Sequence, residues 1–81
     1  MLLRRLIKEG QVVVDVGAHI GYYTVLLARM VGKGRVFAFE PEPSNFSLLA
    51  KNVEINGCKN VVLVKKLFQI KLVKLDYTFL K

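Results

Sequence analysis

The sequence is poor in the residues that several common kinds of site require. Its single cysteine, Cys58, excludes an internal disulfide and fits a reducing compartment. With His19 as the only histidine, there is no residue set for a metal site or a Cys–His nucleophile. No apolar run approaches the roughly 20 residues that span a bilayer, and no signal-peptide pattern follows Met1. We therefore expect a soluble, cytoplasmic protein without a bound metal.

Acidic residues are also scarce. The 81 residues include 13 Lys and Arg against 6 Asp and Glu, which gives a net charge of +7 and favours anionic partners. Apolar residues make up 53% of the chain, more than a core of this size needs, which hints at faces that something else covers. Because small chains bury a smaller share of their surface than large ones, we expect residues 1–81 to form one small, incomplete domain.

The most informative stretch is residues 12–23, VVVDVGAHIGYY. Its valines surround Asp15 in a run that is apolar on both faces, as in a covered parallel sheet. Gly17 and Gly21 follow, where the backbone can turn sharply and a ligand can approach closely. Backbone amides at the start of the next helix are expected to be free to bind an acceptor. The stretch predicts a strand, a glycine loop and a helix start that together cradle a nucleotide-like ligand.

The remaining pattern alternates between helix and strand. Apolar spacing predicts a lead-in helix over residues 2–8, a strand over 11–16, a helix over 20–31 and strands over 35–39 and 61–64. A further helix begins at Pro43 and ends before Asn56-Gly57. This order predicts an α/β fold with three parallel strands in the order 3-2-1, a partial Rossmann-like sheet flanked by helices.

The tail, residues 65–81, does not continue this alternation. Its apolar positions alternate and slip by one near Leu72-Val73, which favours an added strand with a bulge. A helix with Phe68, Leu72, Leu75 and Phe79 on one face is the alternative. The first strand would otherwise be an unpaired apolar edge, so we expect it to pair with the tail or with a second molecule in a homodimer or larger oligomer.

Two acidic residues end or nearly end predicted strands. Glu40 follows the strand over 35–39 and lies 19 residues after Gly21, near the interval of an acidic ribose-binding residue. A carboxylate can accept two hydrogen bonds and so suits a vicinal diol, although a surface or helix-capping acid is the alternative. Asp15 either holds loop amides as a buried acid or contacts the amino-acid end of a cofactor.

Three segments carry a family resemblance: DVGAHIGYYT from Asp15, FEPEP from Phe39 and LAKNVEING from Leu49. Together they resemble the amino-terminal half of an FkbM-type methyltransferase, a class I enzyme that uses S-adenosylmethionine, and the match covers roughly residues 3–66. The resemblance implies a glycine loop beneath the methionine and ribose portions of the cofactor and Glu40 on the ribose hydroxyls. The candidate cofactor-binding residues are Asp15, Gly17, Ala18, His19, Gly21, Tyr22, Glu40 and Pro41.

Individual loop residues leave alternatives open. His19 could act as a base, but the family tolerates other polar residues at this position, which favours a backbone contact. Of Tyr22 and Tyr23, one is expected in the core and one beside the cofactor. No catalytic residue is identified.

The same resemblance implies that the chain is incomplete. In that fold the first strand is flanked by a fourth strand, and acceptor-binding and catalytic residues come largely from there onward. We expect this chain to lack them and to be an inactive cofactor-binding half, either a natural truncation or a cloned fragment.

Three functions remain open. The first is methyl transfer to a hydroxyl of a small molecule, sugar or lipid. The second is a tRNA methyltransferase, whose nucleic-acid substrate would account for the charge of +7. The third is a binding module without catalysis; NAD is disfavoured because His19 stands where the dinucleotide motif needs glycine.

Overall fold

The computed structural model describes residues 7–66 and 77–80. In these residues a parallel sheet contains β1 (Val12–Val16), β2 (Arg35–Phe39), β3 (Val61–Val64) and β4 (Tyr77–Leu80). The strand order is β3-β2-β1-β4, and every neighbouring pair is parallel. The predicted α/β fold and the order 3-2-1 of its first three strands are therefore confirmed.

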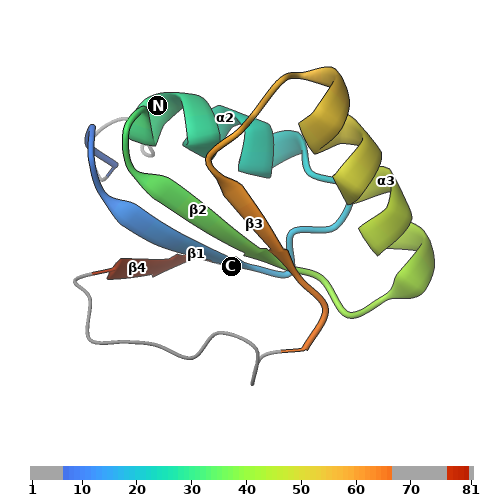
Figure 1. Cartoon of the computed structure of the whole chain (residues 1–81). Coiled ribbons are helices and arrows are strands. Elements are labelled where there is room, and N and C mark those ends of the chain that lie inside the picture. The colour runs from blue at the N-terminus through green and yellow to red at the C-terminus, as the bar shows by residue number, and fades with distance from the viewer. Residues whose placement is uncertain (1–6, 67–76, 81) are drawn as a thin grey trace.

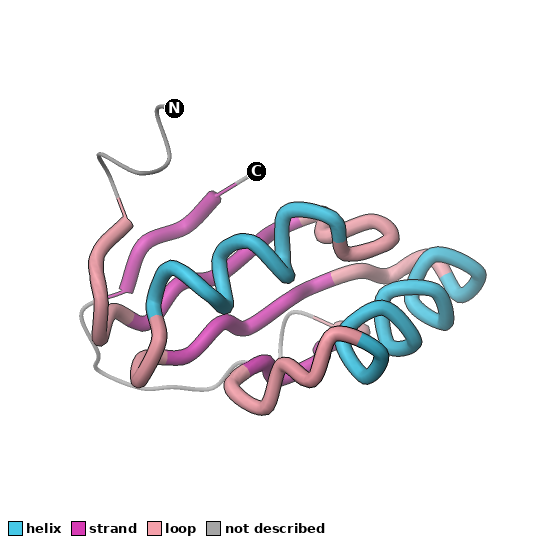
Figure 2. Tube along the Cα trace, turned by 90° about the horizontal axis from the view of Figure 1, so that it is seen from above, coloured by secondary structure: helices cyan, strands magenta, loops and turns pink. Residues whose placement is uncertain are grey.

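Two helices, α2 (Tyr22–Val31) and α3 (Pro43–Ile55), cover the same face of the sheet (Figure 1). Figure 2 shows the same arrangement from above. Apolar side chains of each helix pack on strand residues of that face, because alternate residues of a strand point to the same side. Leu27, Ala28 and Val31 of α2 pack on Val13 and Val36 of the strands. Leu49 and Val53 of α3 pack on Ala38 of β2. Neither described helix is long and apolar enough to cross a membrane.

Strand register brings the ends of β1 and β2 level. Val12 pairs with Arg35 and Val16 with Phe39, so Gly17 and Glu40 each begin the segment that follows its strand. Ligands of open parallel sheets bind at these carboxyl ends. The register therefore places the two predicted site segments side by side, although they are far apart in the sequence.

Residues close in the sequence determine where each helix begins. Pro43 lies in the first turn of α3, where its missing N–H costs nothing, and the Glu42 side chain accepts a hydrogen bond from the Asn45 N–H at 2.8 Å. Helix α2 begins two residues later than the predicted position 20, because Gly21 precedes it in a left-handed conformation with φ of +96°.

The tail prediction can be tested at residues 77–80. Strand β4 pairs with β1 from Val12–Tyr77 to Asp15–Leu80, so an added strand is correct there and the helical alternative is wrong. The free edge of β1 is paired by the chain's own tail, which was the first of its two expected partners. Strand β4 therefore occupies the position beside β1 that a fourth strand has in the resembled fold.

Two predictions fall largely on residues that are not described. The bulge at Leu72-Val73 lies outside the described residues, and so does most of the lead-in helix over 2–8. Ile7 and Lys8 are described and are not helical.

Candidate functional site

The best-defined polar group at the carboxyl edge of the sheet is the Glu40 carboxylate. The residue is only 4% exposed and follows the last residue of β2. Its Oε1 accepts a hydrogen bond from the His19 N–H at 2.7 Å, and its Oε2 accepts one from the Glu42 N–H at 3.1 Å. Because a carboxylate has about four acceptor positions, each oxygen can accept a further hydrogen bond. Glu40 is therefore held against the glycine loop in a fixed orientation.

The glycine loop is tied to β2 by its own amides. The Gly17 and Ala18 N–H groups both donate to the Phe39 carbonyl, at 3.0 and 2.9 Å, and the Gly21 N–H donates to the Ala18 carbonyl. These loop amides are thus used within the protein. No side chain caps the start of α2, so a ligand acceptor would find donors in the first turn of that helix.

The two loop glycines serve different purposes. Both have left-handed backbones, with φ of +76° at Gly17 and +96° at Gly21. A Cβ on Gly17 would meet only His19 Nε2, at 3.8 Å, whereas a Cβ on Gly21 would come within 2.9 Å of Leu49 Cδ1. Gly17 therefore leaves open space beside the loop, and Gly21 allows the start of α2 to pack against α3.

Asp15 is a buried acid that faces α2. It is 5% exposed, and its Oδ2 accepts a hydrogen bond from Thr24 Oγ1 at 2.7 Å. Burial raises the pKa of the Asp15 carboxyl above its usual value, while the Thr24 hydrogen bond and nearby His19 oppose this shift. In the described residues its side-chain partner is this threonine and not a loop amide. Asp15 thus joins β1 to α2, a contact that was not anticipated.

The other candidate residues lie at varying depths. Ala18 is buried in the core beneath α3, and Pro41 is exposed. The His19 side chain is 78% exposed, with Nδ1 4.0 Å from Glu40 Oε1, and its backbone N–H makes the closer contact with Glu40. Tyr22 and Tyr23 are 68% and 57% exposed and pack edge to face on each other, so the expectation of a core tyrosine is wrong.

Two supporting residues were not recognised from the sequence as part of the site. Thr24 is buried and donates its hydroxyl to Asp15; the available signal was a hydroxyl among the apolar positions of the helix over 20–31. Asn52 of α3 donates from Nδ2 to the Ile20 carbonyl at 2.5 Å, which fastens the loop from the other side. In the described residues, no group of three or more His, Cys, Asp and Glu could hold a metal ion.

Comparison with known proteins identifies the family. The sequence model of the TRM5/TYW2 methyltransferase domain matches residues 1–76. The chain belongs to the TRM5/TYW2 methyltransferase family. This confirms the class I methyltransferase part of the sequence resemblance and makes the protein an enzyme by family, with S-adenosylmethionine as the cofactor. The match does not support the narrower assignment to the FkbM type.

Three relatives illustrate the likeness. The tRNA(Phe) (4-demethylwyosine(37)-C(7)) aminocarboxypropyltransferase of Methanocaldococcus jannaschii is 39% identical over 55 residues, which cover 68% of this chain and 22% of that protein. Trm5b from Pyrococcus abyssi is 31% identical with a TM-score of 0.78, over 96% of this chain and 23% of that one. A SAM-dependent O-methyltransferase from Thermotoga maritima is 27% identical with a TM-score of 0.80, over 98% of this chain and 32% of that one.

The TRM5/TYW2 match concerns one part of larger proteins. The chain spans about a fifth of the length of the curated relatives that it matches. The matched residues 1–76 contain the glycine loop and Glu40, and thus the carboxyl edge of the sheet described above.

Proposed function

We propose that this chain is the S-adenosylmethionine-binding part of an RNA-modifying transferase. The observation that carries the proposal is Glu40, a buried carboxylate that two backbone N–H groups hold at the edge of the glycine loop. Each of its oxygens has capacity for one more donor, which suits the two hydroxyls of a ribose. The open space at Gly17 and the uncapped start of α2 fit the rest of such a ligand.

Roles follow for the other candidate residues. Gly17 gives the cofactor room beside the backbone, and the His19 N–H fixes the Glu40 carboxylate. Asp15 orients the start of α2 through Thr24 and lies close enough to the loop to act on the amino-acid end of the cofactor through water. Tyr22 and Pro41 are exposed near the same edge and would border the ligand. When bound, S-adenosylmethionine supplies a sulfonium-linked carbon group for transfer to a nucleophile.

The choice of RNA as acceptor rests on the family and the charge. The M. jannaschii relative is named for action on tRNA(Phe), and a net charge of +7 suits a polyanionic substrate. That relative transfers an aminocarboxypropyl group, so the group transferred is methyl or aminocarboxypropyl. Cofactor labelled in the methyl group or in the carboxyl group would distinguish these transfers, since only the transferred carbon labels the RNA.

A hydroxyl acceptor on a small molecule, as in the FkbM type, is the second candidate. The likeness to the Thermotoga O-methyltransferase over nearly the whole chain favours it. Absence of tRNA binding in a protein that binds S-adenosylmethionine would support this candidate over the first.

Cofactor titration tests the central step. We expect S-adenosylmethionine to bind the wild-type chain in isothermal titration, and Glu40→Gln to bind at least about tenfold more weakly, because a hydrogen bond to a charged group contributes about 1.5–3 kcal/mol. Glu54→Gln, an exposed carboxamide substitution on α3, is the matched control and should bind as the wild type does.

A ligand pair separates ribose recognition from simple loss of folding. The wild type should prefer adenosine to 2′-deoxyadenosine, and Glu40→Gln should lose that preference while its circular dichroism spectrum stays native. Tighter binding of NAD than of S-adenosylmethionine, or an unchanged preference in the variant, would contradict the proposed site.

A further inference from the structure

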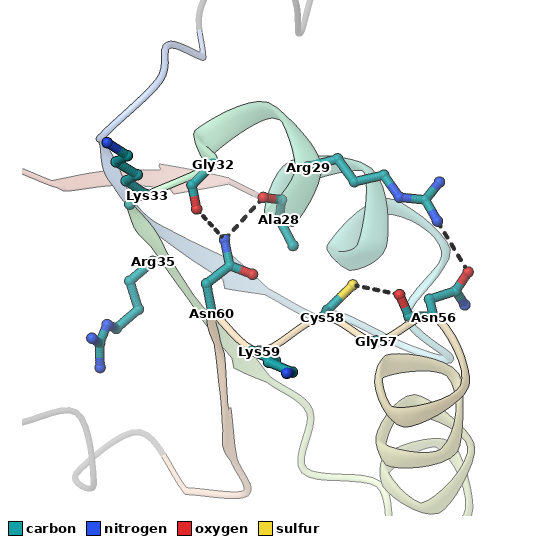
Figure 3. A pocket seen from close by; sticks show the side chains of 11 residues that line it. Ala28, Arg29, Gly32, Lys33, Arg35, Asn56, Gly57, Cys58, Lys59 and Asn60 are labelled. Atoms are coloured by element: carbon teal, nitrogen blue, oxygen red, sulfur yellow. Dashed lines mark hydrogen bonds between the residues drawn. The ribbon is translucent and has the colours of Figure 1, made fainter.

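A second polar region lies at the opposite edge of the sheet. A cavity of about 480 Å³, open to solvent, lies where β2 and β3 begin, between the end of α2 and the loop that follows α3 (Figure 3). Its lining contains the cations Arg29, Lys33, Arg35 and Lys59 and the amides Asn56 and Asn60, and no carboxylate. We call these four cations the amino-edge cluster.

The charges of the amino-edge cluster are available to a ligand. Arg29 Nη2 donates to Asn56 Oδ1 at 3.2 Å, which orients the guanidinium and leaves its other donors unused by that contact. In the described part of the chain none of the four forms an ion pair with a carboxylate. Glu9 is the acid at the rim, and it accepts from the backbone N–H of Lys33 at 2.8 Å. Four cations against one carboxylate leave a net positive surface.

Two carbonyls that would repel an anion here already accept hydrogen bonds. Helix α2 ends at this cavity, and the carbonyl end of a helix carries partial negative charge. Asn60 Nδ2 donates to the Ala28 carbonyl at 2.9 Å and to the Gly32 carbonyl at 3.0 Å. Asn60 thereby offsets the partial negative charge at the end of α2. The cationic side chains therefore determine the positive charge of the cavity.

The arrangement of the cations indicates the kind of anion. In Figure 3, Arg29 lies on one side, Lys33 and Arg35 lie on the other, and Lys59 lies between them, so the charges are spread along the cavity without converging on one point. Converging donors would suit a single phosphate, whereas spaced cations suit successive phosphates of a strand. A nucleic-acid backbone presents such a row, since each strand of a double helix carries one phosphate per about 3.4 Å of helix axis.

We propose that the amino-edge cluster binds the phosphate backbone of the RNA substrate. This rests on the proposed function and adds a second RNA contact, at the edge of the sheet away from the cofactor. Arg35 and Phe39 begin and end β2, so about 13 Å of strand separates the two edges. A nucleic-acid double helix carries about four phosphates of each strand along that length of its axis. One folded RNA can therefore contact the cluster while its modified base lies at the carboxyl edge.

The test measures how RNA affinity depends on salt. A tRNA transcript is titrated by fluorescence anisotropy at 50 and 200 mM salt with the wild type, Arg35→Gln, Lys59→Gln and the double variant. Each phosphate contact contributes about 0.7–0.9 to the slope of log affinity against log salt. We expect the ratio of Kd values at the two salt concentrations to fall about threefold in each single variant and about tenfold in the double variant.

Lys51→Gln is the matched control, because it removes an exposed lysine of α3 that does not line the cavity. Its slope should equal that of the wild type, and all variants should keep native circular dichroism spectra. An equal change of slope in Lys51→Gln and Lys59→Gln would overturn the proposal in favour of diffuse charge attraction.

Two further probes identify the anion. If inorganic phosphate or vesicles with anionic lipid bind through Arg35 and Lys59 while tRNA affinity is unaffected by the substitutions, the RNA assignment is overturned. If the wild type binds no tRNA at all, the proposed RNA-modifying function itself fails. If tRNA binds equally well to wild type and double variant, only the amino-edge cluster fails.

Discussion

The two edges of the sheet carry opposite charges in different surroundings. At the carboxyl edge, Asp15 and Glu40 are buried and each accepts hydrogen bonds from fixed donors. At the amino edge, the amino-edge cluster is exposed and lacks carboxylate partners in the described residues. Burying a charge without partners is costly, so the carboxylates must be held rigidly, whereas exposed cations can adapt. One edge is thus preorganised for a small ligand and the other is suited to a flexible polyanion.

Adding a Cβ to a glycine is expected to destabilise the two edges to different extents. The largest loss of stability is expected at the amino edge. A Cβ on Gly34 would overlap the Gln11 carbonyl oxygen and lie 2.8 Å from the Gly10 carbonyl carbon, both backbone atoms that cannot move aside. We expect Gly34→Ala to lower the free energy of unfolding by about 3 kcal/mol or more in urea denaturation. Gly57→Ala, where a Cβ meets nothing within 4 Å and φ is +65°, should cost only about 1–2 kcal/mol. Equal losses in the two variants would contradict this account.

At the carboxyl edge the corresponding glycine contacts a side chain. Gly21→Ala should lower the free energy of unfolding by about 2 kcal/mol, through the left-handed backbone and the 2.9 Å approach to Leu49 Cδ1. Shortening the partner in Gly21→Ala/Leu49→Ala should give a loss smaller than the sum of the single losses. Additive losses would show that the close approach is not the cause.

Asp15, the buried acid of β1 at the carboxyl edge, is expected to make the stability of the fold depend on pH. Because burial raises the pKa of Asp15 in the folded chain, the folded state binds this proton more tightly than the unfolded state. The stability that Asp15 contributes is therefore present at low pH and lost as the pH rises above about 4 through the raised pKa. Asp15→Asn should gain stability relative to the wild type between pH 4 and 7, measured by urea denaturation. Glu54→Gln, on an exposed residue, should show no such gain, and parallel wild-type and Asp15→Asn profiles would refute the burial argument.

The smallest effect is expected at the His19 side chain. His19→Asn should change S-adenosylmethionine affinity by no more than about fivefold, because the imidazole is 78% exposed and 4.0 Å from Glu40 Oε1, and a pair that water screens contributes at most about 1 kcal/mol. Asparagine also tolerates the left-handed backbone at φ of +54°. His19→Val, whose branched side chain does not, should weaken binding more. The reverse order would mean that the imidazole, and not the backbone N–H, positions Glu40.

Much of the scaffold could be predicted from local pattern. The strands over 35–39 and 61–64 and the start of α3 at Pro43 have the predicted bounds, because apolar runs and proline act within a few residues. The strand order 3-2-1 followed from the right-handedness of parallel crossovers. The positions of Glu40 and Gly17 near one edge followed in turn, since the carboxyl ends of parallel strands meet there.

What the sequence determined by itself, then, was the set of strands and helices, the glycine turn and the acidic residues at the strand ends. Only the tertiary structure decided that the loop amides bond to Phe39, that Asp15 faces Thr24, that both tyrosines are exposed and that β4 pairs with β1. The amino-edge cluster also exists only in the fold, since it joins residues from α2, the turn that follows α2, β2 and the loop before β3. The physical reason is that periodicity reports which face of an element is apolar, whereas hydrogen-bond partners and charge clusters depend on how distant segments pack together.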